Sequence, residues 1–313
     1  MICRLAGRPA YTAPVHANGE GRVDELNRRG LAAAAELART LGLPGTDPVV
    51  LSARGNLLVH FAPAPVVARV ATLTAFSRRD PFAWLAREVA VAGWLADRGG
   101  PVVPPSRVAD PGPHVQDGFA ISLWEYTPPG PRRPSPAEVG AALASLHLAA
   151  VGCPADLGDL TPARDQISEG LDALERESVL APAELGVLRA RHEVLLGRLG
   201  DSGPAIVLHG DAHAGNLMAV AGGWRWFDLE ECCRGPAEWD LATMAAQAGG
   251  DAVAALRGYA GRAGRPPPGP RDLAPFHDLR MLEAVVWTSC MAHLYPARYL
   301  DQARQRLAVF LEE

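Results

Sequence analysis

The sequence predicts an α+β fold of two lobes, a small lobe built on a β-sheet and a larger, mainly helical one. Strand-like apolar runs gather before residue 127, and helical patterns fill most of the chain after residue 140. Between them lies "PPGPRRPSPAEVG", residues 128–140, the clearest proline-rich linker of the chain. We therefore expect an N-terminal lobe over residues 1–126 and a C-terminal lobe over residues 127–313.

The N-terminal lobe alternates apolar runs with turn residues. Its expected elements are a helix over 23–42, strands at about 48–52, 56–61 and 66–73, a helix in "RDPFAWLAREVAVAGWLADRGG" and a strand over 119–127. The second helix is the best marked, because Asp80 is a good N-cap, Pro81 suits the first helical position and Gly99 can end it.

The C-terminal lobe begins with a capping box, Ser135 to Glu138, that opens a helix running to about His147. A strand pair is expected in "NLMAVAGGWRWFDL", with its turn at Gly222-Gly223. The remaining helices are expected at about 165–178, 182–199, 237–247, 251–261, 280–293 and 298–311. The first of these is rich in acidic residues, which suits either a solvated face or the binding of a cationic ligand.

Composition argues against several classes of function. The 313 residues carry a net charge of −5, which indicates no nucleic-acid partner, and no apolar stretch is long enough to span a bilayer. The first 22 residues lack the apolar core of a signal peptide, and the five cysteines (the first is Cys3) are scattered, so we expect a cytoplasmic protein with reduced thiols. The chain contains no lysine, which excludes Schiff-base chemistry and makes every basic side chain an arginine.

A polar run interrupts an apolar stretch in "IVLHGDAHAGNLM", residues 206–218. His209, Asp211 and Asn216 fit H-x-D-x(4)-N, and Asp228 ends the apolar strand that follows. This set suits phosphoryl transfer, in which one Asp accepts the proton of the attacking hydroxyl while the Asn oxygen and the other Asp hold Mg²⁺ against the phosphates. Asp and Asn in a loop also serve simply as turn or cap residues.

The stretch "VLHGDAHAGNLM…WFDLEECCRGPAEWDLA" resembles the aminoglycoside phosphotransferase family, small-molecule kinases with choline kinase-like relatives and a bilobal protein-kinase-like fold. The family's H-G-D-x-H-x-x-N block is matched in full, and Asp228 with Glu230 matches its D-x-[DE] element. "GPAEWDLA" matches part of its D-P-x-x-D-L-A element, with Asp240 as the acid, and "ALASLH" resembles its L-A-x-L-H helix. The resemblance covers roughly residues 48–248.

The resemblance implies roles for residues of the C-terminal lobe. Asp211 would be the catalytic base, and Asn216 and Asp228 would be the magnesium ligands. The supporting residues would be His209, Glu230 and Asp240.

In the N-terminal lobe the resemblance implies a nucleotide site. Arg69 would take the place of the phosphate-binding lysine with Glu88 as its ion-pair partner, and backbone groups near Glu125 and Tyr126 would hold the adenine. The sequence departs from the family pattern twice, because the phosphate loop offers one glycine, Gly55, and arginine replaces lysine. A guanidinium still binds phosphate, although it is longer and planar. The alternative for Arg69 is a strand residue that only makes a salt bridge.

These expectations describe an ATP- or GTP-dependent O-phosphotransferase that acts, with Mg²⁺, on a hydroxyl of a small molecule such as an aminoglycoside, aminosugar or amino alcohol. The departures at Arg69 and Gly55 also suit a degenerate kinase that binds nucleotide and regulates. A third interpretation is a metallohydrolase that uses His209, Asp211 and His213, because H-x-D-x-H offers metal ligands.

Overall fold

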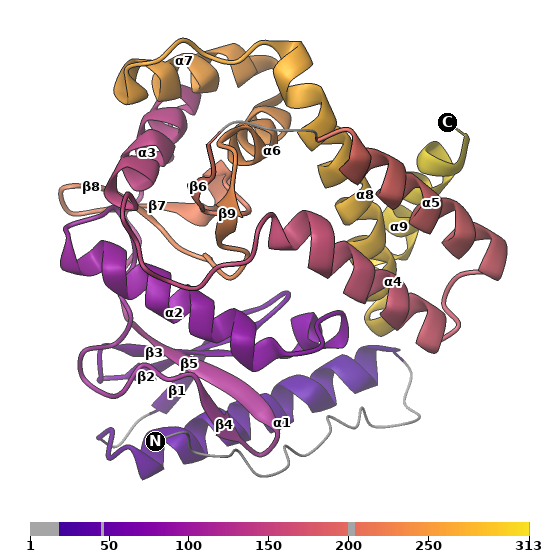
Figure 1. Ribbon diagram of the computed structural model, residues 1–313. Helices are drawn as coiled ribbons and strands as arrows, with labels where there is room; N and C mark the ends of the chain where they lie inside the picture. Colours follow the sequence, from indigo (N-terminus) through magenta and orange to yellow (C-terminus); the bar gives the residue numbers. More distant parts are fainter. Residues whose placement is uncertain (1–18, 45–46, 200–203, 313) are drawn as a thin grey trace, which may run out of the picture.

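The computed structural model describes residues 19–44, 47–199 and 204–312 (Figure 1). The fold is α+β, with a five-stranded antiparallel sheet in the N-terminal part and a helical C-terminal part. The sheet ends at Glu125 and the next helix begins at Pro136, on either side of the predicted lobe boundary. One hydrophobic cluster of buried residues runs through both parts.

The N-terminal part is a sheet with a helix on each side (Figure 1). The strands pair in the order β1-β2-β3-β5-β4, with every neighbouring pair antiparallel. The elements are α1 (Gly19–Thr40), β1 (Asp47–Ala53), β2 (Leu57–Ala62), β3 (Val66–Val70), a 3₁₀ turn (Leu73–Phe76), α2 (Pro81–Asp97), β4 (His114–Gln116) and β5 (Phe119–Glu125).

Alternation along β2 and β3 separates the two faces of the sheet. Leu57 pairs with Val70 and faces α1, which lies so close that a side chain at Gly30 would come within 3.3 Å of Leu57. Leu58 pairs with Arg69 on the opposite face, toward α2. The period of the strand therefore turns Arg69 away from α1 and toward the C-terminal part.

The predicted start and end of α2 are confirmed. The Asp80 side chain accepts a hydrogen bond from the Ala83 N–H at 3.1 Å, Pro81 is the first helical residue, and Gly99 has a φ of +69°. This helix carries Glu88 into the interior, where its side chain is buried.

The C-terminal part holds most of the helices and two short strand pairs, β6 with β9 and β7 with β8. The capping box at Ser135 forms as predicted, whereas the hairpin turn lies at Ala221-Gly222, one residue before the predicted Gly222-Gly223, because Gly223 already pairs with Val220. The elements are α3 (Pro136–Ala149), a π-helical turn (Pro162–Gln166), α4 (Ile167–Arg176), α5 (Pro182–Gly197), β6 (Ile206–Leu208), a 3₁₀ turn (Ala214–Asn216), β7 (Leu217–Val220), β8 (Gly223–Trp226), β9 (Cys233–Gly235), α6 (Glu238–Ala248), a 3₁₀ turn (Gly249–Asp251), α7 (Ala252–Ala263), α8 (Pro270–Leu294) and α9 (Pro296–Glu312).

Several element boundaries differ from the prediction. The strand predicted over 66–73 ends at Val70, because the Thr72 hydroxyl and the Thr74 N–H both turn to the Gly55 carbonyl. The helix predicted at 280–293 begins ten residues earlier, where Pro270 occupies its first position and the Asp272 side chain accepts from the Gly269 N–H. The strands β4, β6 and β9 are too short to show alternation and were not predicted.

Within the described part of the chain, none of the helices combines the length and apolar character needed to cross a membrane. Cys153, Cys232, Cys233 and Cys290 are free and buried. Cys3 and the N-terminal stretch considered for a signal peptide lie outside the described residues, apart from 19–22.

Candidate active site

The loop between β6 and β7, residues 209–216, is fixed through its backbone. The N–H groups of His209 and Gly210 donate to the two carboxylate oxygens of Asp240 at 2.8 and 2.9 Å. Asp240 is completely buried at the start of α6, and the His147 ring bonds to it at 2.9 Å. The predicted supporting residue Asp240 is thus anchored to α3 and holds the loop by its peptide groups.

His209 is used inside the loop by both of its ring nitrogens. Nδ1 accepts from the Asp211 N–H at 3.3 Å and Nε2 donates to the Phe227 carbonyl at 3.1 Å. Burial lowers the pKa of this fully enclosed imidazole, which favours the neutral tautomer that these bonds require. The described residues contain no group of three or more His, Cys, Asp or Glu side chains that could hold a metal ion. The contacts of His209 are those of a supporting residue rather than of a zinc ligand.

Gly210 explains why glycine stands between His209 and Asp211. Its φ is +93°, and a Cβ at this position would lie 2.0 Å from the carbonyl oxygen of Glu231. Another residue would therefore be strained in its backbone and would collide with the chain that follows β8.

Asp211 presents its carboxylate among several donors. Oδ1 is 2.5 Å from Arg280 Nη2, and Oδ2 is 3.3 Å from both Asn216 Nδ2 and His213 Nε2. Burial would raise the pKa of this carboxyl, but the Arg280 cation and the His213 contact together lower it well below its usual range. Asp211 is therefore ionised at neutral pH.

Asn216 and Asp228 are brought together by the β7–β8 hairpin. Leu217 pairs with Trp226, and the Phe227 N–H donates to the Asn216 carbonyl at 3.0 Å. The Asn216 side-chain nitrogen donates to the Asp211 carbonyl at 2.9 Å. Asp228, next in the chain, has a φ of +65°, a conformation that costs a side-chain-bearing residue energy and is common at functional sites.

The oxygen donors at this place fit Mg²⁺. The Asn216 carboxamide oxygen and Asp228 Oδ2 make no hydrogen bond to a described residue, while Asp228 Oδ1 is occupied by Arg69. Amide and carboxylate oxygens are the hard ligands that Mg²⁺ prefers.

Arg69 is buried and surrounded by three carboxylates. Its Nη1 and Nη2 lie 2.8 and 2.7 Å from Asp228 Oδ1, and Nη1 lies 3.1 Å from Glu230 and 3.4 Å from Glu88. The predicted neighbours Arg69 and Glu88 thus meet, but the shortest contacts of Arg69 are with the predicted metal ligand. Burial raises the pKa of Glu88 to about 8. The attraction of the Arg69 cation, 3.4 Å away, lowers the pKa and offsets only part of this effect.

Glu230 joins the two parts of the molecule. It accepts from Asn56 Nδ2 at 2.7 Å, next to Gly55, and lies 2.9 Å from Arg78 Nη1 as well as against Arg69. These three partners all come from the N-terminal part. Glu230 therefore holds the predicted phosphate loop and β3 against the chain that follows Asp228.

The N–H groups of the predicted adenine-binding segment are already used. Glu125 donates to the Pro104 carbonyl at 3.0 Å and Tyr126 donates to the Pro65 carbonyl at 2.9 Å. The Tyr126 ring is stacked on His60 with 3.7 Å between centroids. The role of this segment in holding adenine stays a prediction, and backbone groups other than these two N–H groups would have to serve it.

Sequence reasoning missed several charged and polar residues that complete the site. Arg78 and Gln166 contact the carboxylates after Asp228, and Arg280 reaches Asp211 from α8. Glu231 stands beside Glu230 in the sequence, which is a local signal for an acidic cluster. No comparable sequence pattern indicates that the other missed residues belong to the site. The missed residues are Arg78, Gln166, Glu231, Arg280 and Glu283.

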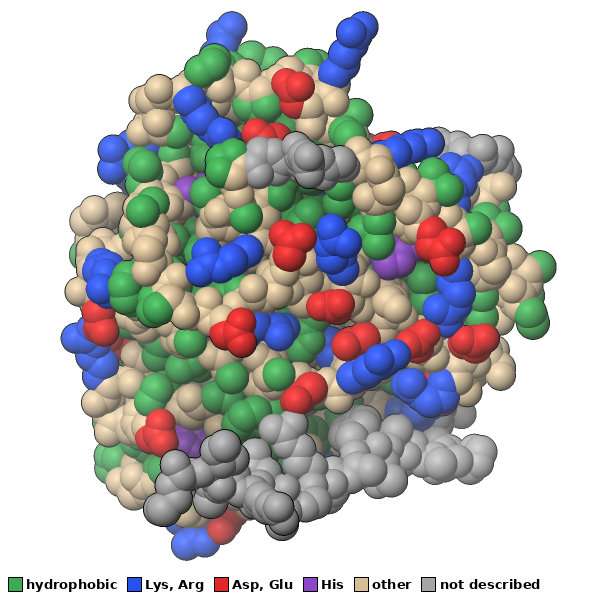
Figure 2. All heavy atoms as spheres, in the orientation of Figure 1, with side chains coloured by type: hydrophobic (Ala, Val, Ile, Leu, Met, Phe, Trp, Pro, Cys, Tyr) green, Lys and Arg blue, Asp and Glu red, His purple; other side chains and the backbone are tan. Residues whose placement is uncertain are grey.

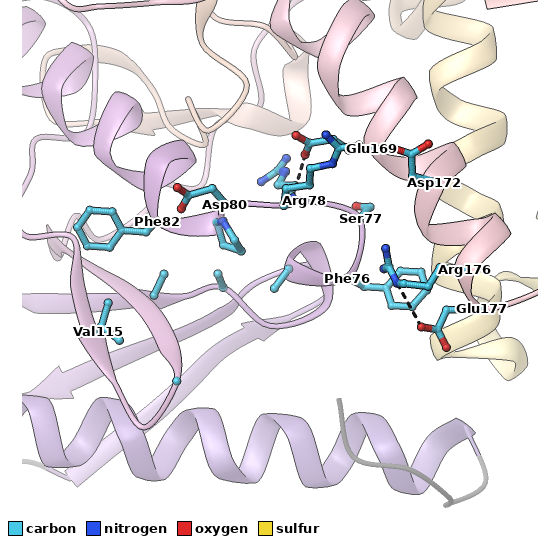
Figure 3. Close-up of a pocket in the computed structure, with 16 residues that line it drawn as sticks. Phe76, Ser77, Arg78, Asp80, Phe82, Val115, Glu169, Asp172, Arg176 and Glu177 are labelled. Atoms are coloured by element: carbon cyan, nitrogen blue, oxygen red, sulfur yellow. Dashed lines mark hydrogen bonds and ion pairs between the residues drawn. The ribbon is translucent and has the colours of Figure 1, made fainter. Parts of the chain in front are cut away.

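A cavity of about 570 Å³ lies beside Arg78, between the sheet and α4 (Figure 3). Figure 3 shows Glu169 and Asp172 of α4 on one side of it and Phe82 and Val115 on the other. The acids of α4 are paired, since Asp172 bonds to Arg79 and to Arg189. On the face in Figure 2, basic and acidic side chains are likewise interspersed across the middle of the molecule.

The sheet, the helical part and this loop-and-hairpin site together define a phosphotransferase with a protein-kinase-like fold, a small-molecule kinase. The chain belongs to the phosphotransferase enzyme family (APH), whose model matches residues 56–276. The family predicted from the motifs is thereby confirmed. No curated protein sequence matches the chain.

Solved structures share the fold at low sequence identity. Amicoumacin kinase hAmiN, in complex with AMP-PNP, Ca²⁺ and Ami, has a TM-score of 0.68 at 13% identity over 90% of this chain and 94% of that one. A choline/ethanolamine kinase family protein from Mesorhizobium loti has a TM-score of 0.60 at 18% identity, over 93% and 94%. Aminoglycoside phosphotransferase APH(3'')-Id from Streptomyces rimosus, with ADP and streptomycin, has a TM-score of 0.54 at 18% identity, over 80% and 98%.

Proposed function

We propose that the protein transfers the γ-phosphoryl group of ATP or GTP to a hydroxyl of a small molecule such as an aminoglycoside, aminosugar or amino alcohol. The observation that carries this proposal is the gathering of Asp211, Asn216 and Asp228 on one loop and one hairpin, with Asp211 held ionised. The structural neighbours include kinases named for amicoumacin, choline or ethanolamine, and aminoglycosides, which supports the same substrate range.

In the proposed reaction Asp211 acts on the acceptor. Its carboxylate orients the acceptor hydroxyl and takes the proton as the hydroxyl oxygen bonds to the γ-phosphorus and the bond to the bridging oxygen breaks. Catalysis of phosphoryl transfer depends mainly on positioning the reactants and stabilising charge, so a strong base is not required. An ion-paired carboxylate suits this task.

Asn216 and Asp228 would hold Mg²⁺ through the carboxamide oxygen and the carboxylate. Bound there, the ion would neutralise negative charge on the phosphates. Arg69 would leave Asp228 and turn its guanidinium to the phosphates, which offer oxygens of the same charge in place of the carboxylate. Glu88, 3.4 Å away, would keep Arg69 near the sheet.

A second candidate function is a degenerate kinase that binds nucleotide without transfer. It is favoured by one observation, the direct occupation of the proposed metal ligand Asp228 by Arg69. Nucleotide binding without turnover of any acceptor would distinguish it from the enzyme.

The test is a nucleotide-consumption screen. Purified protein is mixed with Mg²⁺ and ATP or GTP, and with aminoglycosides, macrolides, aminosugars, choline-like alcohols or amino alcohols, and the product is identified by its added phosphate. We expect at least one acceptor to be phosphorylated by the wild type and not by Asp211→Asn. Turnover that survives in Asp211→Asn would contradict the assignment of the base.

A further inference from the structure

Arg280 has no counterpart among the residues expected from the motifs, yet it makes the shortest contact with Asp211. It lies on α8, and its side chain is largely buried over the ring of Trp239. Nη2 is 2.5 Å from Asp211 Oδ1, and Nη1 is 3.2 Å from the Gly210 carbonyl. One guanidinium thus holds both the carboxylate and the peptide group before it.

Two glutamates keep this guanidinium in place. Glu283, one turn further along α8, is 2.7 Å from Nη1, and Glu231, after β8, is 3.2 Å from the same nitrogen. Because three carboxylates surround a buried cation, moving Arg280 toward a substrate phosphate would leave charges unpaired in the interior. Arg280 also binds the Gly210 carbonyl, and this backbone contact fixes it to the loop that carries Asp211.

The contact makes the two oxygens of Asp211 different. Oδ1 is engaged by a short charge-assisted bond, while among the described residues Oδ2 has only the 3.3 Å contacts with Asn216 and His213. Oδ2 is thus the oxygen with room for a further hydrogen bond. A lysine could not reproduce this arrangement, because only the planar fork reaches Asp211 and the Gly210 carbonyl from separate nitrogens.

We propose that Arg280 is a positioning residue for phosphoryl transfer, which fixes Asp211 through Oδ1 and so presents Oδ2 to the acceptor hydroxyl. This inference rests on the proposed function, because it assigns Arg280 a task only if Asp211 acts on an acceptor.

The test compares Arg280→Met and Arg280→Lys with Arg271→Met, a matched control at the exposed start of the same helix. The reaction followed is the release of phosphate from Mg·ATP with water as the acceptor, together with any acceptor found in the screen. For Arg280→Met we expect kcat to fall about 10- to 100-fold, as loss of alignment does, while KM for ATP stays the same. Arg280→Lys should lose less, and Arg271→Met should behave as wild type.

Two further readouts separate positioning from a merely structural role. Guanidinium chloride at low millimolar concentration should restore part of the rate of Arg280→Met and leave the rate of Asp211→Asn unchanged. In the Asp211→Asn background, Arg280→Met should cause no further loss, because the carboxylate it positions is already gone. If Arg280→Met does not fold, Arg280→Lys retains the buried charge and serves the same comparison.

The outcomes are distinct. Wild-type kcat in Arg280→Met, or a loss that is additive with Asp211→Asn and not rescued by guanidinium, would overturn the inference and leave the proposed function standing. A wild type that phosphorylates no acceptor and releases no phosphate would overturn both.

Discussion

The two halves of the proposed site are held in different ways. Around Asp211 the protein uses backbone groups, since Asp240 takes two loop N–H groups and Arg280 bonds to a loop carbonyl as well as to the carboxylate. Around Arg69 the contacts are between side chains, and they run from β3 to the chain after β8. The first half is fixed by the fold, and the second is held by charges that a ligand can replace.

The difference teaches which half must move. A loop whose peptide groups at His209 and Gly210 are bound by buried side chains keeps its shape when substrate arrives, which is the preorganisation that catalysis needs. In the proposed reaction the Arg69 guanidinium exchanges Asp228 Oδ1 for phosphate oxygens, so this contact would change when nucleotide binds. We therefore expect substitutions near Asp211 to change turnover and those near Arg69 to change nucleotide affinity.

The largest effect is expected for Asp211→Asn. The substitution keeps the shape of the side chain but removes the proton acceptor, so turnover should fall about 10²- to 10⁴-fold while ATP affinity stays nearly unchanged. Initial rates and a fluorescence titration with ATP measure the two quantities. Equal losses of turnover and of ATP affinity would show that the residues around Asp211 and those around Arg69 do not act independently.

Gly210→Ala tests the fixed half. The new Cβ would lie 2.0 Å from the Glu231 oxygen at a φ of +93°, so the free energy of unfolding should fall by about 1–3 kcal/mol or more. Gly222→Ala is the matched control, because Gly222 has a φ of +94° with no atom near enough to collide. Urea unfolding should show a larger loss of unfolding free energy for Gly210→Ala than for Gly222→Ala. Equal losses would show that the close approach of Glu231 does not contribute to the cost.

Arg69→Ala tests the exchangeable half. Loss of a charge-assisted bond to phosphate should weaken ATP binding about 10- to 100-fold and leave adenosine binding unchanged, since adenosine has no phosphate. Arg69→Lys should retain most of the affinity. If ATP and adenosine both bind Arg69→Ala as tightly as they bind wild type, Arg69 only makes a salt bridge.

The smallest effect concerns Glu88 and pH. Its pKa in the folded protein is raised to about 8 by burial, above its ordinary value of 4.5, so its contribution to stability is full below about pH 4.5 and is lost as the pH rises through 8. The loss can be at most about 1.4 kcal/mol per pH unit. Glu88→Gln cannot ionise, and urea unfolding between pH 6 and 9 should show a flatter dependence for it than for wild type.

Much of the fold followed from local patterns. The caps of α2 and α3 are short-range features that formed where they were predicted, and the glycine turn between β7 and β8 formed one residue before its predicted place. Predicted boundaries were wrong where a contact with a residue distant in the sequence ends the element. At Thr72, for example, the chain leaves the strand and the hydroxyl donates to the Gly55 carbonyl.

One short stretch of the sequence is enough to build part of the site. Asp211 and Asn216 share a loop of a few residues, and a tight hairpin returns the chain to Asp228 beside them. Local hydrogen bonds and turn geometry suffice for this, so spacing along the chain carried the information.

The charges that surround those residues depend on tertiary packing. Arg69 meets Asp228 across 159 positions, and Arg280 meets Asp211 across 69. Helical and strand periodicity indicate that a face is buried, but they do not indicate which face of another element it meets. The pairing of buried charges depends on how the helices and the sheet pack, and this packing is not encoded in any local sequence pattern.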